Sequence, residues 1–225
     1  GDNSTVSTKG FVMAGSTSCN VEAYAQNVGV TVRRFVSRVA LQKVNNALPA
    51  SYGAMTINNV TLINVVGNQN LAGAATASTW YNKMGRKDGA TASSQIIDGS
   101  TYLASHPTLT FKSVESSVAS GASHTPTTPY LFYTFPNSTS NDVTGWATSF
   151  TARKTRLVVA ATIGGKKYYY PVVIDAPSRN NAYTVELTIT GLGSTEPDKP
   201  VEKGTINASV TVEGWATGSI YNETI

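Results

Sequence analysis

Residues Tyr183 to Trp215 have the sequence YTVELTITGLGSTEPDKPVEKGTINASVTVEGW, in which apolar and polar side chains alternate over two separate runs. Alternation with a period of two is typical of β-strands that bury one face and expose the other. The first run covers Tyr183 to Thr190 and the second covers Thr205 to Glu213, with a loop that contains two prolines between them. We expect the second strand, near the C-terminal end of the sequence, to be able to pair with another molecule as well as with its own chain.

The composition is that of a folded protein with few charges. The chain has 225 residues, of which 40% are hydrophobic. Charged residues make up 13% of it, against about a quarter in an average domain. This length suffices for one large or two small domains with buried cores. The single cysteine, Cys19, excludes an internal disulfide and a cysteine-based zinc site, so packing must supply the stability.

The net charge of +4 does not indicate a nucleic-acid partner. The basic residues are scattered along the chain, apart from Arg33, Arg34 and Arg38, and no aromatic and basic recognition motif accompanies them. We interpret these three arginines as part of the solvent-facing side of a sheet. The sequence therefore predicts a protein that does not bind nucleic acid.

No pattern of residues predicts catalysis or a bound cofactor. The two histidines, His106 and His124, lie in loop-like sequence, and the nucleophile, zinc-protease and phosphate-binding motifs are absent. The aspartates are isolated, and no segment has the spacing of a calcium loop. Tyr168, Tyr169 and Tyr170 alternate along a predicted strand, which favours core packing over a sugar-binding platform. The sequence predicts a protein that is not an enzyme and holds neither a metal nor a cofactor.

The remaining pattern predicts an all-β protein with two domains. Ser113 to Pro129 is small, polar and proline-containing, as a connection between domains is, so we place a boundary near Ser120. The predicted domains cover residues 1–120 and 121–225. Beyond the boundary, strands are predicted at Tyr130–Phe135, Phe150–Ile163, Lys167–Ile174, Tyr183–Thr190 and Thr205–Trp215. Their regular spacing is typical of an antiparallel sandwich.

Several segments, taken in order, resemble the fimbrillins, the type V pilins that form the fimbrial stalks of Gram-negative anaerobes of the Bacteroidales type. The C-terminal segments are KKYYYPVVI (Lys166–Ile174), an Arg-Asn turn, YTVELTITG, GSTEPDKPV and a strand that ends in Glu-Gly-Trp. The upstream segments are GFVMAG (Gly10–Gly15), VRRFVSRVALQKV (Val32–Val44), MTINNVTLINVV (Met55–Val66) and YLFYTFPN (Tyr130–Asn137). The resemblance implies two tandem transthyretin-like antiparallel β-sandwich domains, the N-terminal one lacking the family's first strands.

The resemblance also bears on one segment whose pattern is ambiguous. The apolar positions from Val32 to Val44 fit the spacing of a helix better than strict alternation. The match to a family strand, together with the β-branched content, favours a long strand with a bulge.

The resemblance further implies a function, that of a structural fimbrial subunit. Fimbrillins are understood to polymerise by donor-strand exchange, in which loss of an N-terminal strand opens an apolar groove that the C-terminal segment of the next subunit fills. Here the donor would lie within Thr205–Ile225. We expect the alternation of apolar and polar side chains to shift at Gly214, as it does at a bulge, which leaves open whether the part before or after Gly214 is donated. The expected plug residues are Ile206, Val210, Val212, Trp215 and Ile220.

The implied partners are identical or related fimbrial subunits at the cell surface, with membrane attachment only through a lipidated precursor at the outer membrane. Family members are matured by an arginine-specific protease, but its cut lies upstream of the segment that Arg33, Arg34 and Arg38 match. The alternative is a fimbrial tip subunit or surface adhesin that binds a host glycan or host protein. Such a protein is expected to have an extra domain, or a groove with exposed aromatic and acidic side chains.

Overall fold

The structure is a computed structural model that describes residues 11–20, 28–70, 77–84, 110–142, 150–202 and 204–215. In these residues the regular elements are strands and one short 3-10 turn, η1 (Ala50–Tyr52). The strands are β1 (Met13–Ala14), β2 (Arg33–Arg34), β3 (Ser37–Asn46), β4 (Met55–Ile63), β5 (Val65–Val66), β6 (Trp80–Tyr81), β7 (Phe111–Val118), β8 (Ser123–His124), β9 (Tyr130–Thr134), β10 (Thr155–Ile163), β11 (Lys166–Ile174), β12 (Asn181–Ile189) and β13 (Ile206–Gly214). The prediction of an all-β protein is confirmed. Within the described ranges, no helix is long and apolar enough to cross a membrane.

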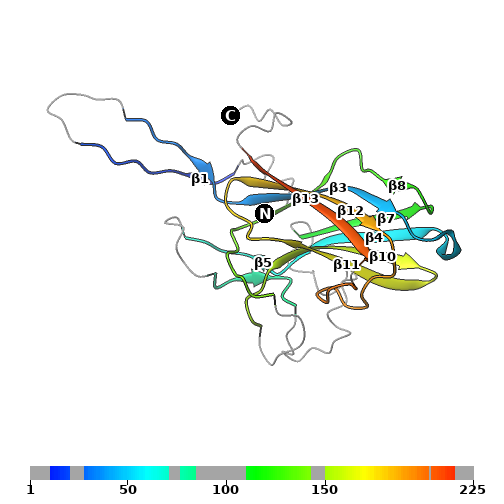
Figure 1. The fold of residues 1–225 in the computed structure, drawn as a ribbon. Helices are drawn as coiled ribbons and strands as arrows, with labels where there is room; N and C mark the ends of the chain where they lie inside the picture. Colours follow the sequence, from blue (N-terminus) through cyan, green and yellow to red (C-terminus); the bar gives the residue numbers. More distant parts are fainter. Residues whose placement is uncertain are drawn as a thin grey trace.

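Two sheets pack face to face as a sandwich (Figure 1). Sheet I has the order β13-β12-β3-β8, and β9 also pairs with β3, so that β8 and β9 follow one another along the same side of β3. Sheet II has the order β11-β10-β4-β7 and is antiparallel throughout. Sheet I differs from the antiparallel arrangement that we expected, because β3 and β12 run parallel. The short pairs β1-β2 and β5-β6 lie outside the two sheets.

One apolar core fills the space between the sheets. On β10, Leu157, Val159 and Ala161 face this core, whereas Val158 and Ala160 belong to a second cluster on the outer side of sheet II. A strand that is buried on both faces has a nearly continuous apolar sequence. The double burial of β10 therefore explains the run LVVAATI, which does not alternate.

The three consecutive tyrosines of β11 divide between the two clusters. Tyr168 and Tyr170 pack in the main core, and Tyr169 is buried in the second cluster. Burial raises the pKa of Tyr170, so its hydroxyl stays protonated and donates a hydrogen bond to the Gly191 carbonyl oxygen at 3.1 Å. The prediction that these rings serve packing is confirmed.

Each sheet joins strands from both sides of the boundary that we expected near Ser120. β4 pairs with β10, and β3 pairs with β12. The described strands therefore form one sandwich and do not divide into domains 1–120 and 121–225. The segment interpreted as a linker forms most of β7, a tight turn and β8, and the amide of Gly121 donates to the Asn46 carbonyl oxygen at 2.7 Å. Its small polar side chains suit a strand at the edge of a sheet, where one side contacts solvent.

The strand predicted over Val32–Val44 is present, and it contains the predicted bulge. Most of it is β3, whose register with β12 shifts at Gln42. An extra residue in a strand turns the side chains that follow it to the opposite face. Val39, Leu41 and Val44 therefore all enter the core.

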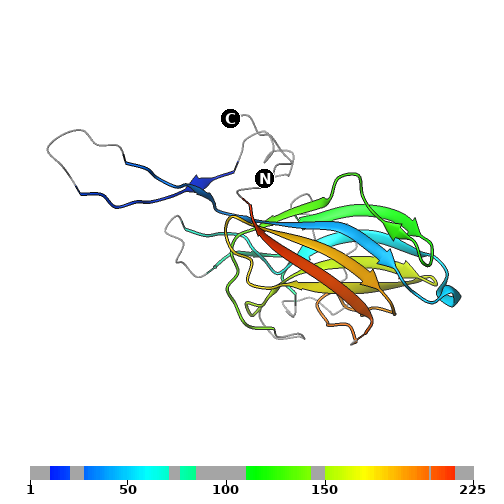
Figure 2. The same ribbon diagram turned by 45° about the horizontal axis from the view of Figure 1, so that its top comes forward.

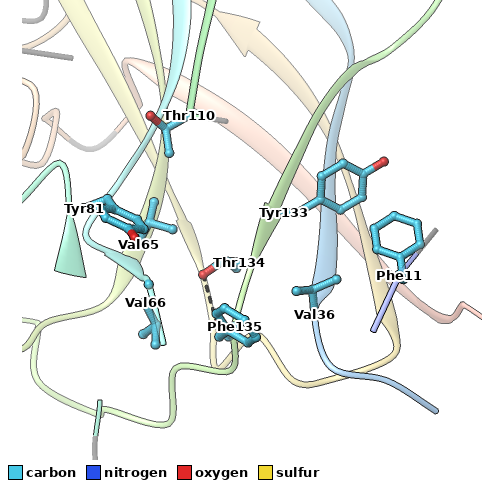
Figure 3. Close-up of a pocket in the computed structure, with 10 residues that line it drawn as sticks. Phe11, Val36, Val65, Val66, Tyr81, Thr110, Tyr133, Thr134 and Phe135 are labelled. Carbon is cyan, nitrogen blue, oxygen red and sulfur yellow. Dashed lines mark hydrogen bonds between the residues drawn. The ribbon is translucent and has the colours of Figure 1, made fainter. Parts of the chain in front are cut away.

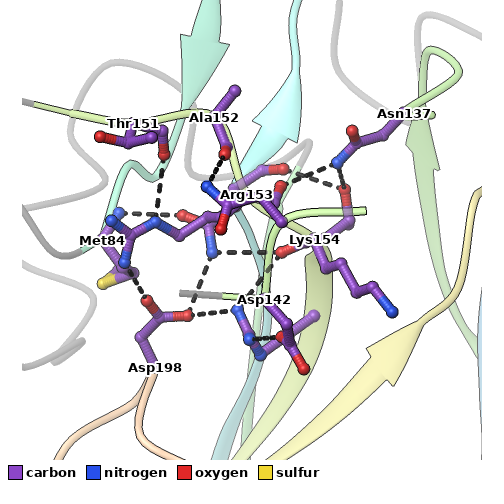
Figure 4. Close-up of polar contacts among 12 residues, drawn as sticks. Met84, Asn137, Asp142, Thr151, Ala152, Arg153, Lys154 and Asp198 are labelled. Carbon is purple, nitrogen blue, oxygen red and sulfur yellow. Dashed lines mark hydrogen bonds and ion pairs between the residues drawn. The ribbon is translucent and has the colours of Figure 1, made fainter. Parts of the chain in front are cut away.

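A buried ion network closes one end of sheet II (Figure 4). Arg153 and Arg156 are fully buried, and the Asp198 carboxylate accepts hydrogen bonds from them at 2.9 Å and 2.7 Å. The side-chain amide of Asn64 donates to the same carboxylate at 3.1 Å, and Arg156 also pairs with Asp142. The network thus fastens the loop after β12 to β10 and to the end of β4.

Burial and charge act in opposite directions on the central carboxyl group. Burial raises the pKa of Asp198, whereas Arg156 and Arg153 oppose this rise. Asp142 and Asp198 are isolated from other carboxylates in the sequence, and in the structure both pair with Arg156. The residues of this network lie far apart in the sequence, so no local sequence pattern predicts it.

Asp198→Asn tests how much the fold depends on this network. The change leaves the buried guanidinium of Arg153 without a carboxylate and leaves Arg156 with only the partly exposed Asp142, so we expect the free energy of unfolding to fall by about 3 to 5 kcal/mol. Asp175→Asn is the matched control, because Asp175 pairs with Lys154 through a side chain that is 77% exposed; its effect should stay below about 1 kcal/mol. Urea unfolding measures both variants, and equal effects would contradict a stabilising role for the buried pair.

Candidate assembly surface

β13 is the outermost strand of sheet I (Figure 2). It pairs with β12 from Ile206 to Gly214 without a shift of register. Its inward-facing side chains Ile206, Ala208 and Val210 pack against the core but are only partly buried. The last described strand of the chain therefore has a single neighbour and an apolar row that its own subunit leaves half-covered.

The structure places four of the five predicted plug residues. Ile206 and Val210 belong to the partly buried row, and the side chain of Val212, farther along β13, is 51% exposed. Trp215 is buried on the outer face of sheet I, the opposite face from this row. Ile220 lies outside the described residues.

The alternation of β13 continues past Gly214. Asn181 pairs with Gly214, and the amide of Trp215 donates to the Asn180 carbonyl oxygen at 2.8 Å. The phase shift expected beside Gly214 is therefore absent, and Trp215 has the same orientation as the polar residues of β13.

Trp215 is the centre of an aromatic and arginine cluster. Its ring stacks on Tyr133 with the ring centroids 5.9 Å apart, and it meets Phe11 edge-on at 4.8 Å. The guanidinium carbons of Arg34 and Arg38 lie 4.6 Å and 5.4 Å from its centroid. Such cation–π contacts contribute about 0.5 to 2 kcal/mol each. The two arginines, which we expected to face solvent, are half-buried and hold Trp215 in place.

An apolar cavity of about 200 Å³ lies beside this cluster (Figure 3). Phe11 and Tyr133 belong to both. The other apolar lining residues are Val36, Val65, Val66, Tyr81 and Phe135. Segments far apart in the sequence thus meet around a space that has room for apolar side chains.

A polar hollow of about 400 Å³ lies on the outer face of sheet I. Its lining residues are Gln42, Thr184, Glu186, Ser209, Thr211 and Glu213. These side chains include two carboxylates but no aromatic ring. The hollow therefore lacks the stacking surface that we expect of a sugar-binding groove.

The described part of the chain contains no cluster of three or more His, Cys, Asp or Glu side chains that could hold a metal ion. His124 lies on β8, its Nε2 is 2.9 Å from the Tyr130 hydroxyl oxygen, and burial lowers its pKa. These contacts are those of a packed side chain. His106 lies outside the described residues.

The sequence matches no family model and no curated protein. Solved structures with a similar fold include a fimbrilin from Porphyromonas gingivalis, 16% identical with a TM-score of 0.49, which covers 83% of this chain and 59% of its own. Candidate cell adhesion proteins from Parabacteroides distasonis and Bacteroides eggerthii are 17% and 19% identical, with TM-scores of 0.49 and 0.47. Each also covers 83% of this chain, and the alignments take in 53% and 57% of their own lengths. The chain thus spans less than two thirds of the length of these proteins.

A double-mutant cycle between Trp215→Leu and Arg38→Ala tests the cluster. If the guanidinium group interacts with the indole face, the two changes should be non-additive by about 1 kcal/mol in the free energy of unfolding. Trp215→Ala, which removes most of a buried side chain, should cost about 3 kcal/mol. Additive effects of the first two changes would contradict the cation–π contact.

Proposed function

We propose that this protein is a structural subunit of a cell-surface fimbria that polymerises by exchanging its C-terminal strand and supports adhesion. The observation that carries the proposal is the position of β13 at the edge of sheet I with its apolar row half-covered. A strand held on one side by one neighbour can leave that neighbour and pair with the equivalent strand of another subunit. The order of fimbrillin-like segments along the sequence supports the same function.

The free energy that favours exchange must come from groups that the single subunit leaves unsatisfied. The bonds between β13 and β12 are equal in number whether β13 belongs to the same subunit or to the next one. Burying an exposed apolar side chain contributes about 1.5 to 3 kcal/mol. Ile206 and Val210 already have part of this contribution, whereas Val212 is 51% exposed. Val212 is therefore the described plug residue that gains most from a neighbour.

The acceptor in this proposal is the β12 edge of the next subunit, together with the apolar cavity at the end of the sandwich, which receives the apolar side chains at the end of the donated segment. Phe11 lines it from the N-terminal segment, and Val36, Tyr133 and Phe135 line it from the body of the fold. Displacement of the segment that carries Phe11 would widen the cavity into a slot for the apolar side chains of a neighbour. Loss of an N-terminal segment and capture of a C-terminal one would then be two steps of a single assembly process.

The proposed partners are further copies of this chain or related subunits in a filament outside the cell. The proposed precursor is lipidated and held at the outer membrane, as the resemblance implies. We propose no enzymatic step for this chain itself.

Removal of residues 205–225 tests the donor assignment. We expect the shortened chain to form no filaments, as seen by electron microscopy, and to bind a labelled peptide of residues 205–225 added in trans. A peptide with Ile206→Asp and Val210→Asp should bind more than about a hundredfold less tightly, because two apolar contacts of at least about 1.5 kcal/mol each are lost.

The matched control peptide carries Asn207→Asp and Thr211→Asp. It has the same two added charges, but on the polar side of the strand, and should lose less than about tenfold in affinity. Filaments of normal length from the shortened chain, or equal binding of the two charged peptides, would overturn the proposal.

A further inference from the structure

Three of the sheet edges carry features that block pairing with another chain. On β11, Tyr169 exchanges two backbone hydrogen bonds with Ser194, at 2.8 Å and 3.0 Å, and Pro171 lies within the strand. β7 has an irregular register with β4, and Glu115 has a φ of 46°. β9 is only five residues long, and Pro129 and Pro136 lie close to its two ends. Bulges, prolines, short strands and covering loops are the devices that protect sheet edges.

β13 lacks these devices along its described length. It has nine residues, with no proline, no basic residue and no shift of register. Glu213 is its only charged residue. An edge strand of this length and composition is a template for β-pairing.

The hydrogen bonds at the two ends of β13 determine which backbone groups point outward. Trp215 donates to Asn180, and Thr190 donates to Thr205, so hydrogen-bonded pairs with β12 fall at the odd-numbered residues of β13. The N–H and C=O groups of the alternate residues therefore point away from β12. These residues are Ile206, Ala208, Val210 and Val212.

We propose that this outer edge pairs with the same edge of a second copy of the chain, antiparallel and about a two-fold axis at Ser209. In this register Ile206 bonds to the partner's Val212 and Ala208 bonds to the partner's Val210. Ser209 faces the partner's Ser209 in a position without hydrogen bonds between the two residues. The two copies of sheet I become one continuous sheet.

The side chains of β13 are complementary to themselves in this register. On the core side, apolar residues face apolar residues, and Val212 gains the cover that its own subunit does not supply. On the outer side, Asn207 faces the partner's Thr211, and Glu213 faces the partner's Thr205, so no like charges meet. A shift by two residues would set Ile206 opposite Gly214, which has no side chain.

The pairing goes beyond the proposed function and does not rest on it. It uses the side of β13 that faces away from β12, with which no described strand pairs, and this side is the same whether β13 lies in its own subunit or in a neighbour. A two-fold contact closes at two copies, whereas strand exchange produces an open series. The mass of the assembly therefore distinguishes the two proposals, because edge pairing gives a dimer and strand exchange gives larger oligomers.

Cysteine crosslinking in a Cys19→Ser background tests the register. Residues that face each other without hydrogen bonds have Cα atoms about 4.5 Å apart. Ser209→Cys should therefore give a disulfide-linked dimer by itself under mild oxidation. Asn207→Cys and Thr211→Cys should crosslink only when the two variants are mixed, because like residues are about 13 Å apart in this register.

Val212→Lys tests the pairing without oxidation. It places a charge on the side of the strand that the partner covers, and should abolish the dimer in light-scattering measurements across a concentration series. Val32→Lys is the matched control, because both valines are 51% exposed and Val32 is not part of β13; this variant should dimerise as the parent does. A parent that stays monomeric, or crosslinking of all three cysteine variants alone to the same extent, would overturn the proposal.

Discussion

The fold depends on two pairings between strands that lie far apart in the sequence, β3 with β12 and β4 with β10. Each pairing places a strand from the first third of the chain at the centre of a sheet, beside a strand from the last third. Closing such long loops costs conformational entropy, and burial of the shared apolar core offsets this cost. Neither half of the chain has this core by itself.

The central position of β12 explains why β13 is exposed. β12 has β3 on one side, so the strand that follows it must occupy the other side and become the edge of sheet I. An edge strand has a neighbouring strand on one side only, so its apolar side chains are incompletely buried. Ile206 and Val210 are examples. The edge position of β13, on which the proposed assembly rests, is thus a consequence of the strand order in the sandwich.

The buried ion network controls how the chain reaches β13. Asp198 lies in the loop between β12 and β13, and its bonds to Arg153 and Arg156 fasten that loop to the end of β10. Buried charges of this kind add little net stability, but losing one partner is costly. The network therefore fixes the path of the loop, while the strand after it keeps one side free.

Alternation of side chains was enough to predict the all-β class, the strands β11 to β13 and the packing of the β11 tyrosines, because strand periodicity is a local property. The bulge in β3 was expected from the family resemblance and the β-branched content, since the local spacing there fits a helix better. Pairing is not local, and nothing in the sequence around Ser120 or Gln42 says that strands from the two halves share both sheets or that β3 and β12 run parallel. The contacts of Trp215 could not be predicted either, because the alternation near Gly214 did not show which face of the strand this residue occupies. Nor could those of Asp198, whose arginine partners lie over forty residues away in the sequence. Tertiary structure alone decided these contacts, since they depend on which surfaces meet in space once the core has formed.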